Sequence, residues 1–117
     1  MRVLILEDEA LIAALLVDWM AELGHEVVGP VATTAAALAI EPAAIDVALL
    51  DLHVRDGDSY GVATRLAASR IPFAFASGSG PEELGDGFRG SPVLSKPFCF
   101  EDLEGLLRRW EQSRRSR

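Results

Sequence analysis

Short apolar runs separated by longer helical patterns constrain the fold of this chain more than any other feature of its sequence. The runs are rich in Val, Ile, Leu and Phe and show little alternation with polar residues. This pattern is typical of strands that are buried on both faces of a parallel sheet. We predict strands at residues 3–6, 26–31, 45–50, 73–76 and 93–95.

Between these runs, apolar residues recur at the spacing of amphipathic helices. We predict helices at residues 10–23, 35–40, 59–70 and 100–111. Within the first of them the inward positions are Leu11, Ile12, Leu15, Leu16, Trp19, Met20 and Leu23. Strands that alternate with helices form an α/β fold with a parallel sheet. Five such strands fit a flavodoxin-like (βα)5 three-layer sandwich with the sheet order 2-1-3-4-5.

The segment at residues 78–90 departs from this pattern because it contains five glycines. Each glycine in a helix interior weakens that helix by up to ~1 kcal/mol relative to alanine. We therefore predict that the fourth helix of the sandwich is short or irregular.

Length, charge and cysteine content narrow the class of protein. A chain of 117 residues, half of them hydrophobic, is expected to form one domain with its own core. The formal net charge of −7 argues against nucleic acid as a partner. No apolar stretch reaches the ~20 residues that span a membrane, and the single cysteine, Cys99, leaves no internal disulfide. We expect a soluble, cytoplasmic protein that binds neither nucleic acid nor membrane.

Acidic residues directly follow two of the predicted strands. Glu7 and Asp8 follow the first strand, and Asp51 ends the third. These strands are neighbours in the order 2-1-3-4-5, and open α/β sheets bind ligands beyond the carboxyl ends of such a pair. Converging carboxylates repel one another, and oxygen-rich acidic clusters suit Mg²⁺. We therefore predict a Mg²⁺ site, although Asp8 alone is equally suited to cap the helix that follows.

Two further strand ends indicate phosphate chemistry. Ser77 ends the fourth strand, and Lys96 follows the fifth. A hydroxyl and an ammonium beside an Asp–Mg²⁺ site suit a phosphoryl group, whose transfer depends mainly on positioning and charge neutralisation. An Asp carboxylate can itself act as the nucleophile and form an acyl phosphate.

These residues lie in four motifs, LILEDE, ALLDLHVRDG, FASG and SKPF. In their order and spacing the chain resembles the receiver domain of bacterial two-component response regulators. The resemblance covers residues 1–117 as a single receiver domain, with a basic tail at 110–117 that we expect to fray. The segment IPFAFASGSG is similar to the Pro-Phe-x-Phe-Ala-Thr-Gly stretch of stand-alone receivers from alphaproteobacteria, with Ser77 in place of their threonine.

The resemblance implies a role for each acidic residue. Asp51 matches the phosphoacceptor, and Asp8 matches a direct ligand of Mg²⁺. Glu7 matches the acid that reaches the ion through water. The backbone carbonyl of His53 would complete the ligands that the protein supplies, together with Asp51 itself.

The resemblance also assigns the residues around the phosphate. Ser77 matches the switch hydroxyl, and Lys96 matches the lysine that pairs with the phosphate. The Lys96–Pro97 peptide bond is cis in the family. The side chains of His53 and Ser79 are expected to tune access to the phosphoacceptor.

Two positions differ from the common receiver pattern. Arg55 stands where many receivers have a proline, and Val93 stands where they have the aromatic switch residue. Without that aromatic residue, the glycine-rich segment at 78–90 is the alternative moving part.

The resemblance implies a signalling protein rather than an enzyme, although a receiver contributes to its own phosphorylation and dephosphorylation. Its expected partners are a sensor histidine kinase or a histidine phosphotransfer protein, which would bind near Leu11 to Leu15. A downstream protein would bind the face formed by 81–110, and a weak homodimer is compatible with this class. Output would follow from protein contact or from onward transfer of the phosphoryl group in a phosphorelay.

Other functions of an α/β domain fit the sequence less well. FMN needs a hydroxyl- and glycine-rich phosphate loop after the first strand, where the sequence EDEA would repel phosphate. A dinucleotide would need Gly-x-Gly-x-x-Gly at the same place. An Asp-nucleophile phosphatase usually shows Asp-x-Asp, whereas residues 51–53 read Asp-Leu-His. The remaining alternative is an unphosphorylated pseudo-receiver that acts as an interaction module.

Overall fold

A parallel five-stranded sheet forms the centre of this computed structural model, which describes residues 1–115. Neighbouring strands are hydrogen-bonded in the order β2-β1-β3-β6-β7, which is the predicted order 2-1-3-4-5. The strands are β1 (Arg2–Leu6), β2 (Glu26–Val31), β3 (Val47–Asp51), β6 (Phe73–Ser77) and β7 (Val93–Ser95). The flavodoxin-like fold that the strand and helix patterns predict is therefore confirmed.

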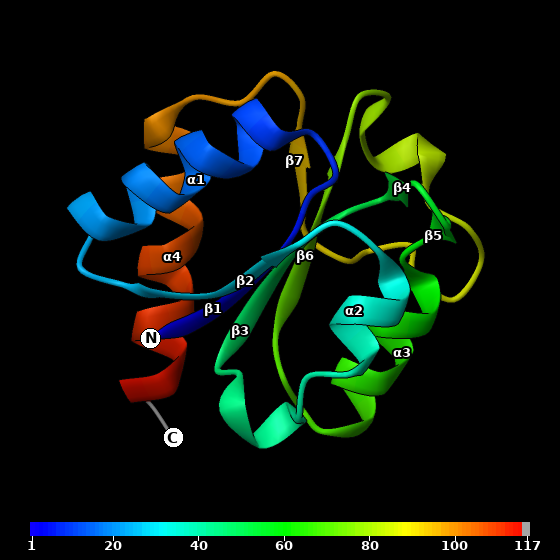
Figure 1. Cartoon of the computed structure of the whole chain (residues 1–117), viewed down its shortest axis with the longest axis horizontal. Helices are drawn as coiled ribbons and strands as arrows, with labels where there is room; N and C mark the ends of the chain where they lie inside the picture. Colours follow the sequence, from blue (N-terminus) through cyan, green and yellow to red (C-terminus); the bar gives the residue numbers. More distant parts are fainter. Residues whose placement is uncertain (116–117) are drawn as a thin grey trace.

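Four α-helices cover the two faces of the sheet (Figure 1). They are α1 (Ala10–Glu22), α2 (Thr34–Leu38), α3 (Tyr60–Ala68) and α4 (Phe100–Arg115). In the figure α1 and α4 lie on one side of the sheet, and α2 and α3 lie on the other. This arrangement is the expected three-layer sandwich. No helix among the described residues is both long and apolar enough to cross a lipid bilayer.

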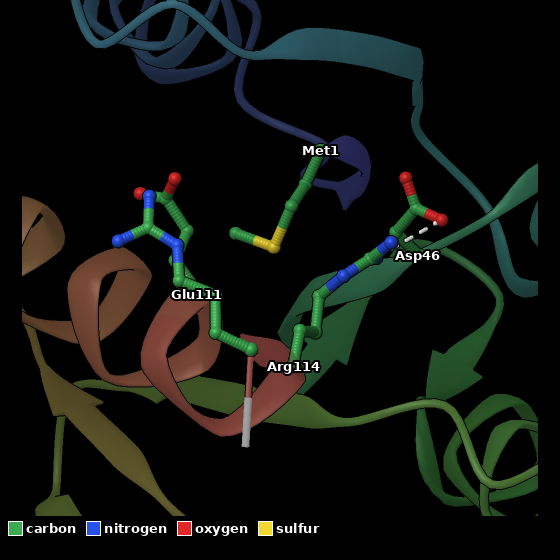
Figure 2. Close-up of a pocket in the computed structure, with 5 residues that line it drawn as sticks. Met1, Asp46, Glu111 and Arg114 are labelled. Carbon is green, nitrogen blue, oxygen red and sulfur yellow. Dashed lines mark ion pairs between the residues drawn. The ribbon is translucent and has the colours of Figure 1, made fainter. Parts of the chain in front are cut away.

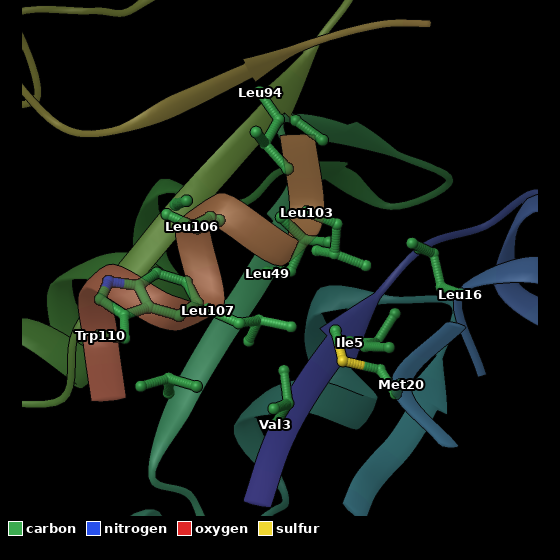
Figure 3. Packing of buried hydrophobic residues seen from close by; sticks show 13 residues of the cluster. Val3, Ile5, Leu16, Met20, Leu49, Leu94, Leu103, Leu106, Leu107 and Trp110 are labelled. Atoms are coloured by element: carbon green, nitrogen blue, oxygen red, sulfur yellow. The ribbon is translucent and has the colours of Figure 1, made fainter. Parts of the chain in front are cut away.

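The side chains of β1 alternate between two separate cores. Val3 and Ile5 pack in the core beneath α1 and α4, whereas Leu4 and Leu6 pack in the core beneath α2 and α3. Successive residues of a strand point to opposite faces, so a strand inside a three-layer sandwich has to be apolar at every position. Figure 3 shows the first core. Its members are Val3, Ile5, Leu16, Met20, Val47, Leu49, Ala74, Ala76, Leu94, Leu103, Leu106, Leu107 and Trp110.

The glycine-rich segment forms only one turn of 3-10 helix, η2 (Gly80–Glu83), where the common (βα)5 pattern has a fourth α-helix. Gly80 begins this turn with a φ of 73°, a conformation that glycine adopts at little cost. The prediction of a short or irregular fourth helix is therefore confirmed. A second 3-10 turn, η1 (Pro42–Ala44), precedes β3.

Three details differ from the sequence-based expectations. Helix α4 continues to Arg115, beyond the predicted end at residue 111, and its last turn is held by the ion pair between Arg114 and Asp46 at 3.1 Å. The expected fraying of 110–117 stays a prediction, and residues 116 and 117 lie outside the described residues. Leu11 and Leu15 were expected to point inward, but they are 88% and 44% exposed, because Ala13, Leu16 and Met20 form the buried stripe of α1.

The third difference lies in the loop after β3, which contains a small antiparallel hairpin. Its strands are β4 (His53–Val54) and β5 (Gly57–Asp58), with His53 paired to Asp58. The polar residues of this loop gave no periodic strand signal, because two-residue strands are too short to show one. The structure also contains two cis peptide bonds, Lys96–Pro97 and Gly29–Pro30.

Candidate functional site

The carboxyl ends of the central strands bring the predicted site residues together at one edge of the sheet. Glu7 follows β1, Asp51 ends β3, Ser77 ends β6 and Lys96 follows β7. Asp51 is paired in register with Ala76, the residue that precedes Ser77. Parallel strands end at the same edge of a sheet, so four strands each deliver one polar side chain to a shared crevice.

Three carboxylates converge in this crevice. Glu7, Asp8 and Asp51 each offer an oxygen atom, and these atoms lie within 4.8 Å of one another. Glu7 is 4% exposed and Asp51 is 8% exposed. The N-cap residue of α1 is Glu9, and its side chain makes no capping hydrogen bond. Asp8 therefore does not cap α1, although the Glu7 carboxylate accepts a hydrogen bond from the backbone N–H of Glu9 at 3.0 Å.

Among the described residues, the Lys96 ammonium forms the ion pairs with this cluster. Its Nζ lies 3.1 Å from Glu7 Oε1 and 3.2 Å from Asp51 Oδ2. Burial alone would lower the pKa of the Lys96 ammonium, but hydrogen bonds and charges from Glu7 and Asp51 outweigh it and raise that pKa. Lys96 therefore stays protonated and offsets part of the negative charge.

One ammonium does not neutralise three carboxylates. Burial and, to a lesser extent, the negative charge of Glu7 raise the pKa of Asp51 to about 6, although Lys96 opposes both effects. Burial and like charge both disfavour an ionised carboxylate. The site thus holds an excess of negative charge that a divalent cation would relieve, and carboxylate oxygens are ligands that suit Mg²⁺.

Side-chain contacts join the β4–β5 hairpin to η2 beside the cluster. His53 of β4 reaches Glu83 of η2, with 2.9 Å between His53 Nε2 and Glu83 Oε1. The backbone N–H of Ser79 donates to Ser77 Oγ at 3.2 Å. Hydrogen bonding from the Ser79 side chain, assisted by Ser77 and His53, lowers the pKa of Glu83. The side chains of His53 and Ser79, which were predicted to tune access, therefore both interact with Glu83.

The hairpin loop is anchored to its other neighbours by Arg55 and Asp56. Arg55 donates to the carbonyl oxygen of Asp8 across 3.4 Å. The Asp56 carboxylate accepts hydrogen bonds from the backbone N–H groups of Thr34 and Ala35, at 2.8 and 3.1 Å. Asp56 thus satisfies free N–H groups in the first turn of α2, a role usually filled from within the helix.

An aromatic cluster holds the glycine-rich segment, and sequence reasoning missed it. The rings of Tyr60 and Phe88 are stacked with their centroids 4.7 Å apart, and both rings also contact Phe75 edge to face. Gly85 donates its backbone N–H to the Tyr60 hydroxyl oxygen at 2.7 Å. Phe88, the single aromatic residue in a run of glycines, was the only sequence signal of this anchor.

A second pocket, of about 450 Å³, lies at the opposite end of the strands. Figure 2 shows its lining residues Met1, Asp46, Glu111 and Arg114, with Asp46 and Arg114 joined in an ion pair. Both signs of charge line this pocket, and they neutralise each other locally. We therefore assign it a structural role, at the junction of α4 with the starts of the strands.

Comparison with known proteins gives matches among solved structures. No family model matches the chain, and no curated protein matches it. The solution structure of SdrG from Sphingomonas melonis Fr1 is 43% identical to this chain and has a TM-score of 0.80. The match covers 93% of this chain and 94% of that one. The chain belongs to the receiver-domain family of response regulators.

Two further receiver-family structures were solved in defined states. The BeF3-activated conformation of SdrG from Pseudomonas melonis Fr1 is 44% identical, with a TM-score of 0.77, and the match covers 91% of this chain and 92% of that one. The receiver domain of sensor histidine kinase PA1611 from Pseudomonas aeruginosa PAO1 was crystallised with a magnesium ion in its active site cleft. It is 22% identical, with a TM-score of 0.74, over 93% of this chain and 95% of that one. At this sequence identity, the likeness to the PA1611 domain shows the fold alone.

Proposed function

We propose that this receiver accepts a phosphoryl group on Asp51 in a Mg²⁺-dependent reaction, as a single-domain response regulator. The convergence of Glu7, Asp8 and Asp51 within 4.8 Å, with Lys96 at their edge, is the observation that carries the proposal. The BeF3-activated state of SdrG supports it, because BeF3 has the shape and charge of a phosphoryl group.

The acidic residues present fit a Mg²⁺ ion. Asp8 and Asp51 would bind it directly, the backbone carbonyl of His53 would be a third ligand, and Glu7 would act through water. Mg²⁺ keeps several waters and commonly takes one or two carboxylates, which matches this set. When bound, the ion would neutralise charge on the phosphoryl oxygens.

The chain's own residues then have separate tasks. An Asp51 oxygen attacks the phosphorus of a phosphohistidine, so that a P–O bond forms, the P–N bond breaks and the imidazole leaves with its electron pair. The Lys96 ammonium, already 3.2 Å from Asp51 Oδ2, is placed to pair with a phosphoryl oxygen. The Ser77 hydroxyl would donate a hydrogen bond to another phosphoryl oxygen.

The surface of α1 supports docking of a phosphodonor protein. Leu11 and Leu15 are 88% and 44% exposed. A groove lined mainly by apolar residues runs beside them, formed by Ile12, Leu15, Leu16, Trp19, Lys96, Pro97 and Phe98. A histidine kinase or phosphotransfer protein bound there would lie next to Lys96. Since such a partner acts in the cytoplasm, we propose the same location for this receiver. A downstream protein would use the face of 81–110, which comprises η2, β7 and the first two-thirds of α4.

Intact mass measurement tests this proposal. The purified protein is incubated with acetyl phosphate, with and without Mg²⁺, beside an Asp51→Asn variant. We expect a gain of one phosphoryl group that requires Mg²⁺ and is absent from the variant. A titration with Mg²⁺ alone addresses the alternative, because a pseudo-receiver would bind the ion no better than Asp51→Asn does.

A further inference from the structure

Arg55 places a guanidinium group at the rim of the candidate site. It lies in the turn between β4 and β5, and it is exposed to solvent. Its Nη2 donates to the backbone carbonyl oxygen of Asp8 across 3.4 Å. Together with Glu7 and Asp8, Arg55 also lines a pocket of about 340 Å³. The guanidinium therefore adjoins two residues of the acidic cluster.

Contacts on both sides hold this turn in place. The Asp56 carboxylate binds the backbone N–H groups of Thr34 and Ala35 at 2.8 and 3.1 Å, which joins the turn to α2. His53 Nε2 lies 2.9 Å from Glu83 Oε1, which joins the strand before the turn to η2. A group that is already held in place loses less entropy when it binds a ligand. The hairpin is therefore suited to present a binding side chain.

The positive charge of Arg55 has no carboxylate partner among residues 1–115. Its hydrogen bond to the Asp8 carbonyl uses one of the five N–H groups of a guanidinium. Because the side chain is exposed, its remaining N–H groups can bind an anion, and a guanidinium fits two phosphate oxygens with parallel hydrogen bonds. A proline, which many receivers have at this position, could supply no such group.

A phosphodonor is an anion that has to approach a negatively charged site on a negatively charged protein. The chain has a formal net charge of −7, and oxygens of Glu7, Asp8 and Asp51 lie within 4.8 Å of one another. Lys96 offsets part of this charge within the crevice, whereas Arg55 adds a positive charge at its rim. Charges around a site can change the rate at which a charged ligand binds by roughly tenfold or more.

We propose that Arg55 is a phosphodonor-binding residue, whose guanidinium attracts an anionic donor and binds its phosphoryl oxygens at the rim before transfer to Asp51. This inference rests on the proposed function of Asp51. When acetyl phosphate is the donor, an Asp51 oxygen forms the new P–O bond, the P–O bond to the acetyl group breaks, and acetate leaves with the electron pair. Arg55 takes no part in this exchange of bonds, so its effect should increase with the negative charge of the donor.

Phosphorylation by two small donors tests the inference. At neutral pH acetyl phosphate is a dianion, whereas phosphoramidate is mainly a monoanion. The second-order rate constant for each donor, in saturating Mg²⁺ and low salt, is measured by intact mass for the unmodified chain, Arg55→Gln, Arg55→Lys and the control Arg108→Gln. Arg108 lies on α4 with its side chain 70% exposed, so its replacement removes the same charge outside the acidic cluster.

The effect should follow the charge of both the residue and the donor. We expect Arg55→Gln to react about three- to tenfold more slowly with acetyl phosphate, and to lose less with phosphoramidate. Arg55→Lys should recover most of the rate because it keeps the charge. Arg108→Gln should match the unmodified chain within about twofold, and added salt should shrink the difference between Arg55→Gln and the unmodified chain, because ions screen charges at an exposed site.

Mg²⁺ binding separates this role from a structural one. Removing a positive charge beside the acidic cluster should not weaken Mg²⁺ binding. Arg55→Gln should therefore reach half-saturation at an equal or lower Mg²⁺ concentration than the unmodified chain, although it is phosphorylated more slowly. If Arg55 only joined the hairpin to Asp8, its loss would disturb the metal site and would weaken Mg²⁺ binding together with the rates for both donors.

The possible results have distinct meanings. A larger loss with acetyl phosphate than with phosphoramidate, recovered in Arg55→Lys, would support the role of Arg55. Equal rates for Arg55→Gln and the unmodified chain, an equal loss with both donors, or weaker Mg²⁺ binding by Arg55→Gln would overturn that role and leave the phosphorylation of Asp51 intact. If the unmodified chain gains no phosphoryl group from either donor, the proposed function itself fails, and the inference fails with it.

Discussion

At the residue scale, Asp51 carries a charge that its surroundings oppose. Its carboxylate is buried beside Glu7, and both effects raise its pKa to about 6, against partial compensation by Lys96. The folded protein without a cation therefore keeps an unfavourable charge at the point where a chemical group is expected to attach. Buried, mutually repelling charges are common at functional sites, and they lower the free energy of unfolding of the protein.

Replacing Asp51 by Asn removes that charge and keeps the shape of the side chain. Without Mg²⁺, we expect Asp51→Asn to increase the free energy of unfolding by about 1–2 kcal/mol, because like-charge repulsion and the burial of a charge are both relieved. Urea unfolding at neutral pH measures the change. Asp86→Asn is the control, since Asp86 has a side chain that is 99% exposed and should change little. A less stable Asp51→Asn protein would show that the Lys96 pair outweighs the repulsion.

At the scale of elements, the glycine-rich segment is irregular in secondary structure but well anchored. Leu84 is 3% exposed, and Phe88 stacks on Tyr60. The segment is therefore held near its end by the Phe88 ring and near its middle by Glu83 and Leu84. Any rearrangement of η2 would pivot about the Tyr60–Phe88 stack rather than free the whole segment.

The Tyr60 hydroxyl tests this anchor. We expect Tyr60→Phe to keep the ring stack but to lose the hydrogen bond from Gly85, lowering the free energy of unfolding by about 1 kcal/mol. Amide hydrogen exchange at 84–88 should accelerate, whereas exchange in α4 should not. If exchange accelerates equally throughout the molecule, the segment is not an independent unit.

A second anchor joins three elements at the amino ends of the strands. The carboxylate of Asp46, which precedes β3, accepts from the backbone N–H of Arg2 at 2.6 Å and pairs with the guanidinium groups of Arg2 and Arg114 at 3.1 Å each. These interactions, the Arg2 side-chain hydrogen bond above all, hold the pKa of Asp46 well below its usual range. They connect the starts of β1 and β3 to the end of α4.

Replacing Asp46 by Asn should therefore weaken the whole fold. We expect the free energy of unfolding at pH 7 to fall by about 1–3 kcal/mol, because two guanidinium groups lose their carboxylate partner. The contribution of Asp46 is present above its unfolded pKa and is lost as pH falls through its folded pKa, so the two proteins should converge in strong acid. Equal stability of the variant and the unmodified chain at pH 7 would contradict this.

The sequence allowed much of this architecture to be predicted, for identifiable reasons. The strand order followed from the alternation of buried runs with helices, and the acidic cluster followed from the rule that parallel strands end at one edge of the sheet. The contacts of Glu83, Tyr60 and Phe88 could not be predicted, because they arise from the path of a loop that has no periodicity. Leu11 was misplaced because α1 uses the small residue Ala13 in its buried stripe.

At the scale of the whole molecule, the response to pH depends on groups at both ends of the sheet. The side chain of His25 is 5% exposed, and it lies 3.1 Å from the amino group of Met1 and 3.6 Å from Glu111. Burial lowers the pKa of His25, the N-terminal ammonium lowers it further, and Glu111 opposes both. The unfolded chain therefore binds a proton at His25 at a higher pH than the folded chain does.

The sign of the pH effect follows from this shift. Between pH 7.5 and 5.5 the unfolded state gains a proton at His25 before the folded state does, so the free energy of unfolding should fall by up to about 1 kcal/mol. Asp51 acts in the opposite direction over the same range, because its folded pKa is raised. The test is therefore the difference between the unmodified chain and His25→Gln, measured by urea unfolding at both pH values. An identical pH response in the two proteins would exclude a role for His25.

The acidic cluster and the Asp46 anchor lie at opposite ends of the same strands. The chemistry resides at the carboxyl ends, whereas the salt-bridged junction of β1, β3 and α4 resides at the amino ends. Substitutions at the amino ends can consequently increase the free energy of unfolding without altering the acidic cluster at the carboxyl ends. A heat-resistant version of this receiver domain should be attainable by redesigning the contacts of Asp46 with Arg2 and Arg114 alone, with the acidic cluster left unchanged.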